Sequence, residues 1–216
     1  TMYFGNVALR SPENIAEEIR AAVEKYGFRS IFFDDDTFNL GTKRISNLCD
    51  YLKEISIPWT MMGRLDISPD WLYDKMVDSG CVGMRFGVET FNIDVLKNIE
   101  KGIERRDFRK TLEYICLTFP EVMIHITMMS DMPGQTAEDT EMDMKIIKKM
   151  GFSADNILRS YQLSKCAPFP GTKLYEQMKT RLDEATLKSY TAYDGGQDTI
   201  MKASKKKIPY HVETWS

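Results

Sequence analysis

Three consecutive carboxylates directly follow a short apolar run. Residues 31–38 read IFFDDDTF, so Asp34, Asp35 and Asp36 stand where an apolar strand would end. Neighbouring negative charges repel one another, and such a cluster needs a compensating positive group at the end of a buried strand. The pattern therefore predicts that these carboxylates face a cation or a cationic group. One of them could equally cap the following helix or close a turn.

Polar side chains also mark the ends of the other predicted strands. Arg64 and Asp66 end the second strand, Glu89 ends the third, Asp131 follows the fourth, and Gln162 lies near the end of the fifth. In a parallel α/β sheet these ends share one edge, and ligands bind at that edge. Acids and one arginine along a single edge therefore predict a binding site there.

Several of these residues also have a structural interpretation. Arg64 could pair with Asp66 or with Glu89 and simply neutralise it. His125 lies inside an apolar strand, so we expect a hydrogen-bonded histidine of the core rather than a ligand. Asp131 could serve only to turn the chain.

The elements that must position these residues alternate between strand and helix. Five strands are predicted, at 30–33, 58–66, 81–89, 122–129 and 156–163. Helices are predicted from Ser11-Pro12 to Gly27, through Ile45 to Ile55, from Ser68-Pro69 to Gly80, over about 92–117 with a break near Gly102, from Thr136 to Lys149, and after PFPG at 168–171. Serine, threonine and proline are expected where helices start, and glycine where they end. Five strand–helix units predict a parallel sheet with helical crossovers.

The expected fold is an α/β fold, a partial parallel (β/α) barrel. A long single series of strand–helix units favours a barrel, or an open part of one, over a nucleotide-binding sandwich. The chain starts with a helix that no strand precedes, whereas a complete barrel needs eight units and about 250 residues. We therefore expect about five units and a missing first strand, with residues 1–180 forming the barrel and 181–216 a C-terminal extension. No glycine-rich phosphate loop of the usual kinds is present.

Composition argues against several classes of partner. The chain has 216 residues, 43% of them hydrophobic, which is enough for one sizeable core. Its net charge of 29 − 32 = −3 argues against nucleic acid as the main partner. No apolar run approaches the ~18 residues that span a bilayer, so no membrane is expected. The four cysteines form no CxxC pair, so we expect reduced thiols in a cytoplasmic protein rather than a zinc site or disulfides.

Six segments in a fixed order resemble those of one known family. They are RSPENIAEEI (10–19), IFFDDDTF (31–38), GRLD (63–66), GCVGMRFGVET (80–90), MPGQT (132–136) and PFPGTKLYE (168–176). Together they resemble the radical S-adenosylmethionine enzymes, in particular the large group that often carries a cobalamin-binding domain upstream. The resemblance covers residues 10 to about 176.

The resemblance implies a fold, two cofactors and a site. In this family a partial (β/α)6 barrel holds a 4Fe–4S cluster and S-adenosylmethionine, and one electron from the cluster cleaves the sulfonium to give a 5′-deoxyadenosyl radical. By resemblance, Asp35 and Asp36 occupy the strand end that contacts the methionyl amine, and Glu89 makes a ribose or methionyl contact. Arg64 could meet the methionyl carboxylate, and Gln162 the adenine edge. The acidic run would then face an ammonium group.

One part of the family pattern is missing. The family holds its cluster with CxxxCxxC on the loop after the first strand, and this sequence has no such motif. The resemblance implies a C-terminal piece of a longer enzyme, whose cluster loop and possible cobalamin domain lie outside this chain, or else a family member that has lost the cluster. We expect the isolated chain to be inactive and to bind S-adenosylmethionine weakly or not at all. Asp131 stands where the family commonly has glycine, and Gln135 where it has glutamate.

Two other functions fit the residues without cluster chemistry. Asp34 to Asp36, Glu89, His125 and Asp131 could bind Mg²⁺ or Mn²⁺ in a metal-dependent barrel enzyme, because these ions favour oxygen ligands. The chain could also be a non-catalytic docking domain. These residues leave the substrate of any parent enzyme undefined.

Overall fold

The computed structural model describes residues 7–98, 107–167 and 171–178. Contacts within the chain divide it into two units, residues 8–166 and residues 1–7 together with 167–216. None of the helices in the described ranges combines the length and the apolar character needed to cross a membrane.

The described part of the smaller unit is helix α7 (Lys173–Met178) with the residues just before it. Thr172 caps this helix, because its Oγ1 accepts a hydrogen bond from the backbone N–H of Tyr175 at 3.1 Å. The predicted C-terminal extension at 181–216 lies outside the described residues, so the predicted division into domains stays a prediction.

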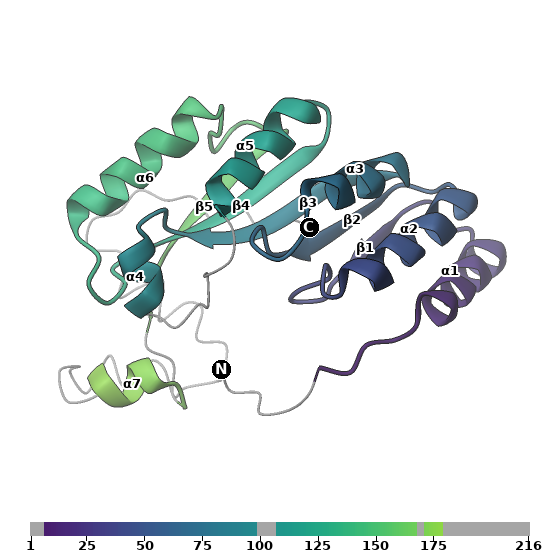
Figure 1. Cartoon of the computed structure of the whole chain (residues 1–216), viewed down its shortest axis with the longest axis horizontal. Coiled ribbons are helices and arrows are strands. Elements are labelled where there is room, and N and C mark those ends of the chain that lie inside the picture. The colour runs from purple at the N-terminus through teal and green to yellow at the C-terminus, as the bar shows by residue number, and fades with distance from the viewer. Residues whose placement is uncertain (1–6, 99–106, 168–170, 179–216) are drawn as a thin grey trace. The chain divides into compact units, whose positions relative to one another are not determined.

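The larger unit is built on one sheet of five parallel strands in the order β1-β2-β3-β4-β5 (Figure 1). The strands are β1 (Ile31–Phe33), β2 (Trp59–Gly63), β3 (Cys81–Glu89), β4 (Met123–Ser130) and β5 (Arg159–Lys165). The helices are α1 (Pro12–Tyr26), α2 (Thr42–Ile55), α3 (Asp70–Asp78), α4 (Ile93–Asn98), α5 (Phe108–Thr118) and α6 (Ala137–Lys149). Consecutive strands lie side by side in parallel, so each connection must cross back over the sheet. The expected α/β fold, a partial (β/α) barrel, is confirmed.

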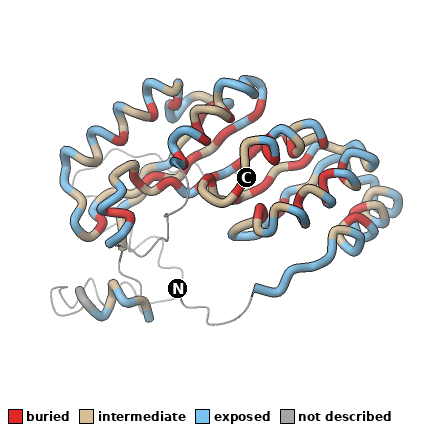
Figure 2. Tube along the Cα trace, viewed as in Figure 1, coloured by how far each residue is buried: buried red, intermediate tan, exposed pale blue. Residues whose placement is uncertain are grey.

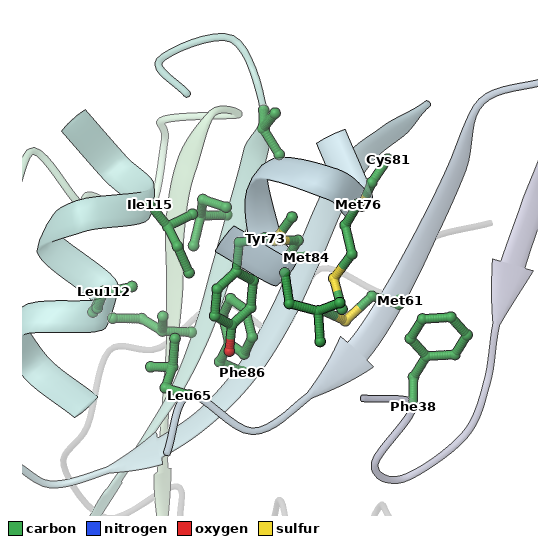
Figure 3. Close-up of a cluster of buried hydrophobic side chains, with 14 of the residues drawn as sticks. Phe38, Met61, Leu65, Tyr73, Met76, Cys81, Met84, Phe86, Leu112 and Ile115 are labelled. Atoms are coloured by element: carbon green, nitrogen blue, oxygen red, sulfur yellow. The ribbon is translucent and has the colours of Figure 1, made fainter. Parts of the chain in front are cut away.

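The hydrophobic core lies between the sheet and the helices on one of its faces. Alternate strand residues point into it, among them Met84 and Phe86 of β3 and Ile124 and Ile126 of β4. Figure 2 shows buried positions along the strands and along the sides of the helices that face them. In Figure 3 side chains of α3 and α5 pack against those of β2 and β3.

The face of the sheet turned away from this core carries the intervening strand residues, and we call it the open face. Because side chains alternate along each strand, residues in register on neighbouring strands share a face. The open-face residues of the central rows are Thr60 and Met62 of β2, Arg85 and Gly87 of β3, His125 and Thr127 of β4, and Ser160 and Gln162 of β5. The open face is therefore mostly polar, in contrast to the core face.

Strand β1 forms one edge of the sheet. Helix α1 packs against α2, and a groove of about 470 Å³ runs between α1 and β1. Its lining includes Ile15, Ile19 and Val23 of α1, Phe32 of β1, and Asp35 just beyond the end of β1. Within the described residues no strand pairs with the outer side of β1, as expected for a barrel that is open at this strand.

Two strands differ from the prediction by more than one residue at an end, and asparagine side chains account for the end of β2 and the start of β5. Strand β2 ends at Gly63, since the side chain of Asn39 bonds to the backbone of the next residue. Strand β5 begins at Arg159 rather than near 156. The Asn156 Oδ1 atom accepts hydrogen bonds from the backbone N–H groups of Leu158 and Arg159 at 3.0 and 3.2 Å, which forms a turn.

The predicted helix starts are confirmed with one exception. Ser11 caps α1, and Thr136 caps α6 in a reciprocal capping box with Asp139. The predicted cap of α3 is wrong, because Pro69 occupies the N-cap position and makes no side-chain bond. Ser68 is buried instead, and its hydroxyl accepts a hydrogen bond from an asparagine side chain of the loop after β1.

A buried arginine fixes the start of β5. Arg159 is 7% exposed, and its guanidinium donates to four backbone carbonyl oxygens. Its Nη1 lies 2.6 Å from the oxygen of Val122 and 2.7 Å from that of Leu158. Its Nη2 lies 3.0 Å from the oxygen of Cys116 and 2.9 Å from that of Phe119, at the C-terminal end of α5. Carbonyl dipoles at a helix end therefore stabilise the positive charge.

Replacing Arg159 with leucine should lower the free energy of unfolding by about 3 kcal/mol, because buried carbonyl oxygens lose their donor. Urea denaturation measures this change. Arg109→Gln is the control, since Arg109 makes an exposed ion pair with Glu113 at 3.1 Å and should contribute less than about 1 kcal/mol. Similar small losses in both variants would contradict a structural role for Arg159.

Candidate functional site

Parallel pairing brings the C-terminal ends of all five strands to one edge of the sheet, which we call the carboxyl edge (Figure 1). Asp35 and Asp36 follow β1, Arg64 follows β2, and Glu89 is the last residue of β3. Gln162 lies within β5, in register with Thr127 of β4 and on the open face. Four of the five predicted site residues therefore lie at the carboxyl edge, whereas Gln162 is the middle residue of β5 and not near its end as predicted.

The acidic run after β1 is solvent-exposed at all three positions. None of these acids caps the next helix, because Gly41 occupies the N-cap of α2 without a side-chain bond, but the expected turn is present and Asp36 is its first residue. A cationic side chain does lie near the run. Burial lowers the pKa of Arg44 on α2, and the negative charge of Asp35 acts in the opposite direction. A basic side chain thus supplies part of the compensation that the three carboxylates require.

Arg64 makes a two-point ion pair with Asp66. Its Nε lies 2.9 Å from Oδ1 and its Nη2 lies 2.7 Å from Oδ2 of that carboxylate. The hydrogen bond to Asp66 raises the pKa of Arg64 above its usual value. The pairing with Asp66 that the sequence left open is therefore present, and the guanidinium is held in a fixed orientation at the end of β2.

Asn39 holds the backbone of Arg64, and sequence reasoning missed it. Its Nδ2 donates to the Arg64 carbonyl oxygen at 2.7 Å, and its Oδ1 accepts from the Arg64 N–H at 2.9 Å. The side-chain amide thus imitates a neighbouring strand while only 1% exposed. A β-carbon at Gly63 would lie 2.5 Å from the Asn39 Oδ1, so this approach requires glycine there. An asparagine in a turn is usually exposed, and no sequence signal marks this one as buried.

Glu89 has an unusual backbone conformation. Its φ of 65° is in the left-handed region, which side chains other than glycine seldom adopt. The N–H of Thr90 donates to the carbonyl oxygen of Val88 at 2.9 Å, so Glu89 is the central residue of a γ-turn. The pairing of β3 with β4 also shifts register between Gly87 and Glu89. Such turns store about 1–3 kcal/mol of strain and cluster at functional sites.

Helix α6 braces the loop that follows Glu89. Oδ1 of Asp143 accepts a hydrogen bond from the backbone N–H of Phe91 at 2.9 Å, and Oδ1 of Asp139 accepts one from Asn92 Nδ2 at 2.8 Å. Burial raises the pKa of Asp143 above its usual range, which is consistent with a side chain only 3% exposed. Asp139 and Asp143 have the sequence pattern of solvent-exposed helix residues, yet they support the turn at Glu89.

The ends of β3, β4 and β5 meet around Cys166. Burial raises the pKa of this thiol, and the charges of Asp131 and Glu89 raise it further, so both carboxylates lie near the sulfur. Asp131 also pairs with Lys165 at 3.3 Å. Asp131 has a φ of 60°, the left-handed conformation that glycine adopts most readily. This conformation explains why glycine, the residue common at this position in the family that the sequence resembles, is suited to it.

His125 is not a core residue, contrary to the prediction. Alternation along β4 turns Ile124 and Ile126 into the core and leaves His125 half-buried on the open face. Its Nε2 lies 3.3 Å from Nη2 of Arg85, and its Nδ1 lies 2.9 Å from Oγ of Ser160. Burial and the neighbouring guanidinium lower the pKa of His125 to about 4.

The ligand set of the alternative metal enzyme is not brought together. Among the described residues no group of three or more histidine, cysteine, aspartate or glutamate side chains is placed to hold a metal ion. His125 also faces the positive charge of Arg85, which disfavours a nearby cation.

The four thiols lie on separate elements, on α2, β3 and α5 and just after β5. Burial raises the pKa of Cys49 and of Cys116 to about 11, and it raises that of Cys81 still more strongly. Iron–sulfur clusters bind thiolates that converge on one point. The thiols of this chain therefore do not fit a 4Fe–4S cluster.

Asn39→Ala should lower the free energy of unfolding by about 2 kcal/mol, because the buried backbone groups of Arg64 lose their partners. Denaturant unfolding tests this, with the exposed Asn14→Ala as control. Gly63→Ala should also destabilise the chain, but less in the Asn39→Ala background, where the clash is relieved. Additive effects in this double-mutant cycle would contradict the close approach.

The pKa of His125 generates a prediction about acid stability. The unfolded chain takes up this proton near the ordinary pKa of 6.5 and the folded chain only near 4, so stability should fall as the pH falls through this window. Arg85→Gln should raise the pKa of His125 by removing the neighbouring charge, but not to 6.5, because burial persists. An NMR titration of the imidazole measures the pKa directly. A pKa unchanged by Arg85→Gln would contradict the contact.

The family model described as the radical SAM superfamily matches residues 2–147. Among curated proteins, an uncharacterized methyltransferase of Pyrococcus horikoshii is 28% identical over 170 residues, covering 77% of this chain and 35% of that protein. A tRNA-2-methylthio-N(6)-dimethylallyladenosine synthase of Desulfitobacterium hafniense is 23% identical, covering 89% of this chain and 45% of that protein. This chain therefore spans less than half the length of these relatives.

Solved structures share the fold. The radical S-adenosylmethionine methyltransferase TsrM of Kitasatospora setae, with cobalamin and a 4Fe–4S cluster bound, superposes with a TM-score of 0.61 at 14% identity, covering 71% of this chain and 29% of that chain. The coproporphyrinogen III oxidase HemN of Escherichia coli superposes with a TM-score of 0.54 at 15% identity, covering 86% of this chain and 44% of that chain. The family match extends over well more than half of the residues, and the chain belongs to the radical SAM superfamily.

Proposed function

We propose that this chain forms the S-adenosylmethionine-binding part of a radical SAM enzyme. The observation that carries the proposal is the placement of acidic side chains from β1 and β3 along one carboxyl edge, together with the amide of Gln162 on the adjoining open face. An ammonium, a ribose diol and an adenine edge are the groups of S-adenosylmethionine that carboxylates and amides recognise. Membership of the superfamily supports the same ligand.

Each predicted residue has a separate part in this proposal. Asp35 and Asp36 accept hydrogen bonds from the methionyl ammonium, and their exposure leaves them accessible to it. Glu89 accepts from the ribose hydroxyls, with its carboxylate aimed by the γ-turn. Gln162 donates from Nε2 to Ser164 Oγ at 3.1 Å, so its Oε1 is the atom that would accept from the adenine amino group.

Arg64 already has a carboxylate partner in this chain. Its guanidinium already bonds to Asp66 through Nε and Nη2, so a methionyl carboxylate would have to share or replace that partner. The rigid pair can instead order the end of β2 beside the ligand. Arg64 stays in the proposal as a contact that shares Asp66 with the methionyl carboxylate or reaches it through water.

In this proposal the 4Fe–4S cluster of the family is held by residues outside this chain, in agreement with the dispersed thiols whose pKa burial raises. The cluster supplies the electron for reductive cleavage of S-adenosylmethionine. The isolated chain then binds S-adenosylmethionine weakly and does not cleave it. Its partner in this proposal is the N-terminal part of the same protein, which carries the cluster loop.

Methyl transfer with cobalamin is the reaction class we favour for the whole enzyme. A similar curated protein is described as a methyltransferase, and two structures with the same fold, TsrM and OxsB, contain cobalamin. A cobalamin domain would also belong to the part of the enzyme outside this chain.

Isothermal titration of S-adenosylmethionine into the isolated chain should give weak saturable binding, with a dissociation constant of about 1 mM. Glu89→Gln should weaken binding by about tenfold, since it removes a charge-assisted contact. Glu113→Gln, which removes only an exposed ion pair on α5, should leave binding unchanged. Dithionite should yield no 5′-deoxyadenosine.

Three results would contradict the proposal. Tight binding by the isolated chain would argue against an incomplete site, and binding insensitive to Glu89→Gln would remove the ligand from the carboxyl edge. A rise in melting temperature with Mg²⁺ or Mn²⁺, without any effect of S-adenosylmethionine, would favour the metal-dependent alternative.

A further inference from the structure

A row of three polar side chains crosses the open face on neighbouring strands. Arg85 of β3 is in register with His125 of β4, which is in register with Ser160 of β5. The side chains touch in the same order, at 3.3 Å from Arg85 Nη2 to His125 Nε2 and at 2.9 Å from His125 Nδ1 to Ser160 Oγ. We call these residues the lumen row.

The hydrogen bonds of the lumen row have one direction. A guanidinium can only donate, so Nε2 of His125 accepts from Arg85 and the ring proton resides on Nδ1. Nδ1–H then donates to Ser160 Oγ, and the hydroxyl proton of Ser160 is left to donate elsewhere. The imidazole stays neutral at neutral pH. The row therefore offers donors at both ends and no negative charge.

The charge of Arg85 has no carboxylate counterpart in the described part of the chain. The salt bridges there pair Arg10, Arg20, Arg64 and Arg109 with acids, whereas the side-chain partner of Arg85 is the neutral His125. Arg85 is also exposed on the open face, unlike Arg159, whose charge is surrounded by carbonyl oxygens. A cation held in place without a counter-charge favours an anionic ligand.

The Arg85 end of the lumen row lies away from Glu89, whereas Ser160 lies only two residues before Gln162 on the open face of β5. Arg85 precedes Glu89 by four residues along β3, or about 13 Å at the usual rise of a strand. Below the row, a β-carbon at Gly83 would lie 2.9 Å from the Thr60 methyl carbon and 3.4 Å from the terminal methyl carbon of Met123. These two methyl groups lie beside the row on the side away from the carboxyl edge.

We propose that the lumen row binds the carboxylate or phosphate group of a small molecule lying along the open face. The guanidinium of Arg85 supplies paired donors to the anionic oxygens, and the hydroxyl of Ser160 supplies another. His125 keeps the two donors at a fixed separation. That this molecule is the substrate of the radical enzyme rests on the proposed function, whereas anion binding by the row does not.

The imidazole of His125 is a built-in reporter for the test. The chain has two histidines, so His211→Gln leaves one signal in the NMR spectrum of protein labelled with ¹⁵N-histidine. In this background, inorganic phosphate and acetate are titrated separately at pH 7.5 and constant ionic strength. Saturable shifts of the His125 resonances are expected with at least one of them. Arg85→Gln should weaken that binding by about tenfold or more, because it removes a charge-assisted contact.

Matched variants distinguish anion binding at the lumen row from other causes of a change in the His125 resonances. Arg109→Gln removes an equal charge on α5 and should leave anion binding unchanged. Ser160→Ala should weaken binding by a few fold. A preference for phosphate or for acetate supports the proposal and identifies the anion. Linear shifts without saturation, or shifts equal in size in Arg85→Gln, would overturn it.

The two proposals can fail independently. Arg85→Gln should leave the binding of S-adenosylmethionine unchanged, and Glu89→Gln should leave phosphate and acetate binding unchanged. Phosphate or acetate binding without any S-adenosylmethionine binding would contradict the predicted weak cofactor binding of this chain and keep the lumen row. S-adenosylmethionine binding without saturable anion binding would contradict the lumen-row proposal and keep the proposed function.

Discussion

Alternating side chains along five parallel strands divide between a face packed under helices and a face that no helix of the described ranges in the larger unit covers. This division restricts where each polar group can lie. Apolar residues of β3 and β4 fill the helix-covered side, so the residues between them, Arg85 and His125 among them, must occupy the other. The carboxyl edge follows from the parallel direction of the strands. Strands that each return through a helix all end on one side of the sheet.

The residues that form the carboxyl edge are held by side chains from elsewhere in the sequence. Asn39, from the loop after β1, fixes the backbone at the end of β2, and Asp143 of α6 holds the loop after β3. Both supporting side chains are buried, so their hydrogen bonds are shielded from competing water. The left-handed turn at Glu89 persists because this surrounding structure holds it.

Hydrophobic periodicity and the residues typical of helix ends were sufficient to predict the order of strands and helices. They also predicted that the strands end at one shared edge of the sheet. They predicted β3 to the residue, because its apolar run is bounded by glycine and glutamate. They could not reveal Asn39, Asp143 or the four-carbonyl site of Arg159, since each depends on partners 25 or more residues away. His125 was misplaced because its strand was read as apolar throughout, whereas alternation with Ile124 and Ile126 places the histidine on the opposite face.

The groove between α1 and β1 sets the direction in which an added segment of chain would run. The outer backbone groups of β1 can pair with an added strand. The apolar side of α1 would then cover those side chains of the added strand that point toward the helix. A segment seated there in parallel would emerge next to Asp35, so whatever loop it carries would be delivered to the acidic run. Supplying such a segment as a separate peptide is therefore a route to complementation in trans, with the sheet itself acting as the guide.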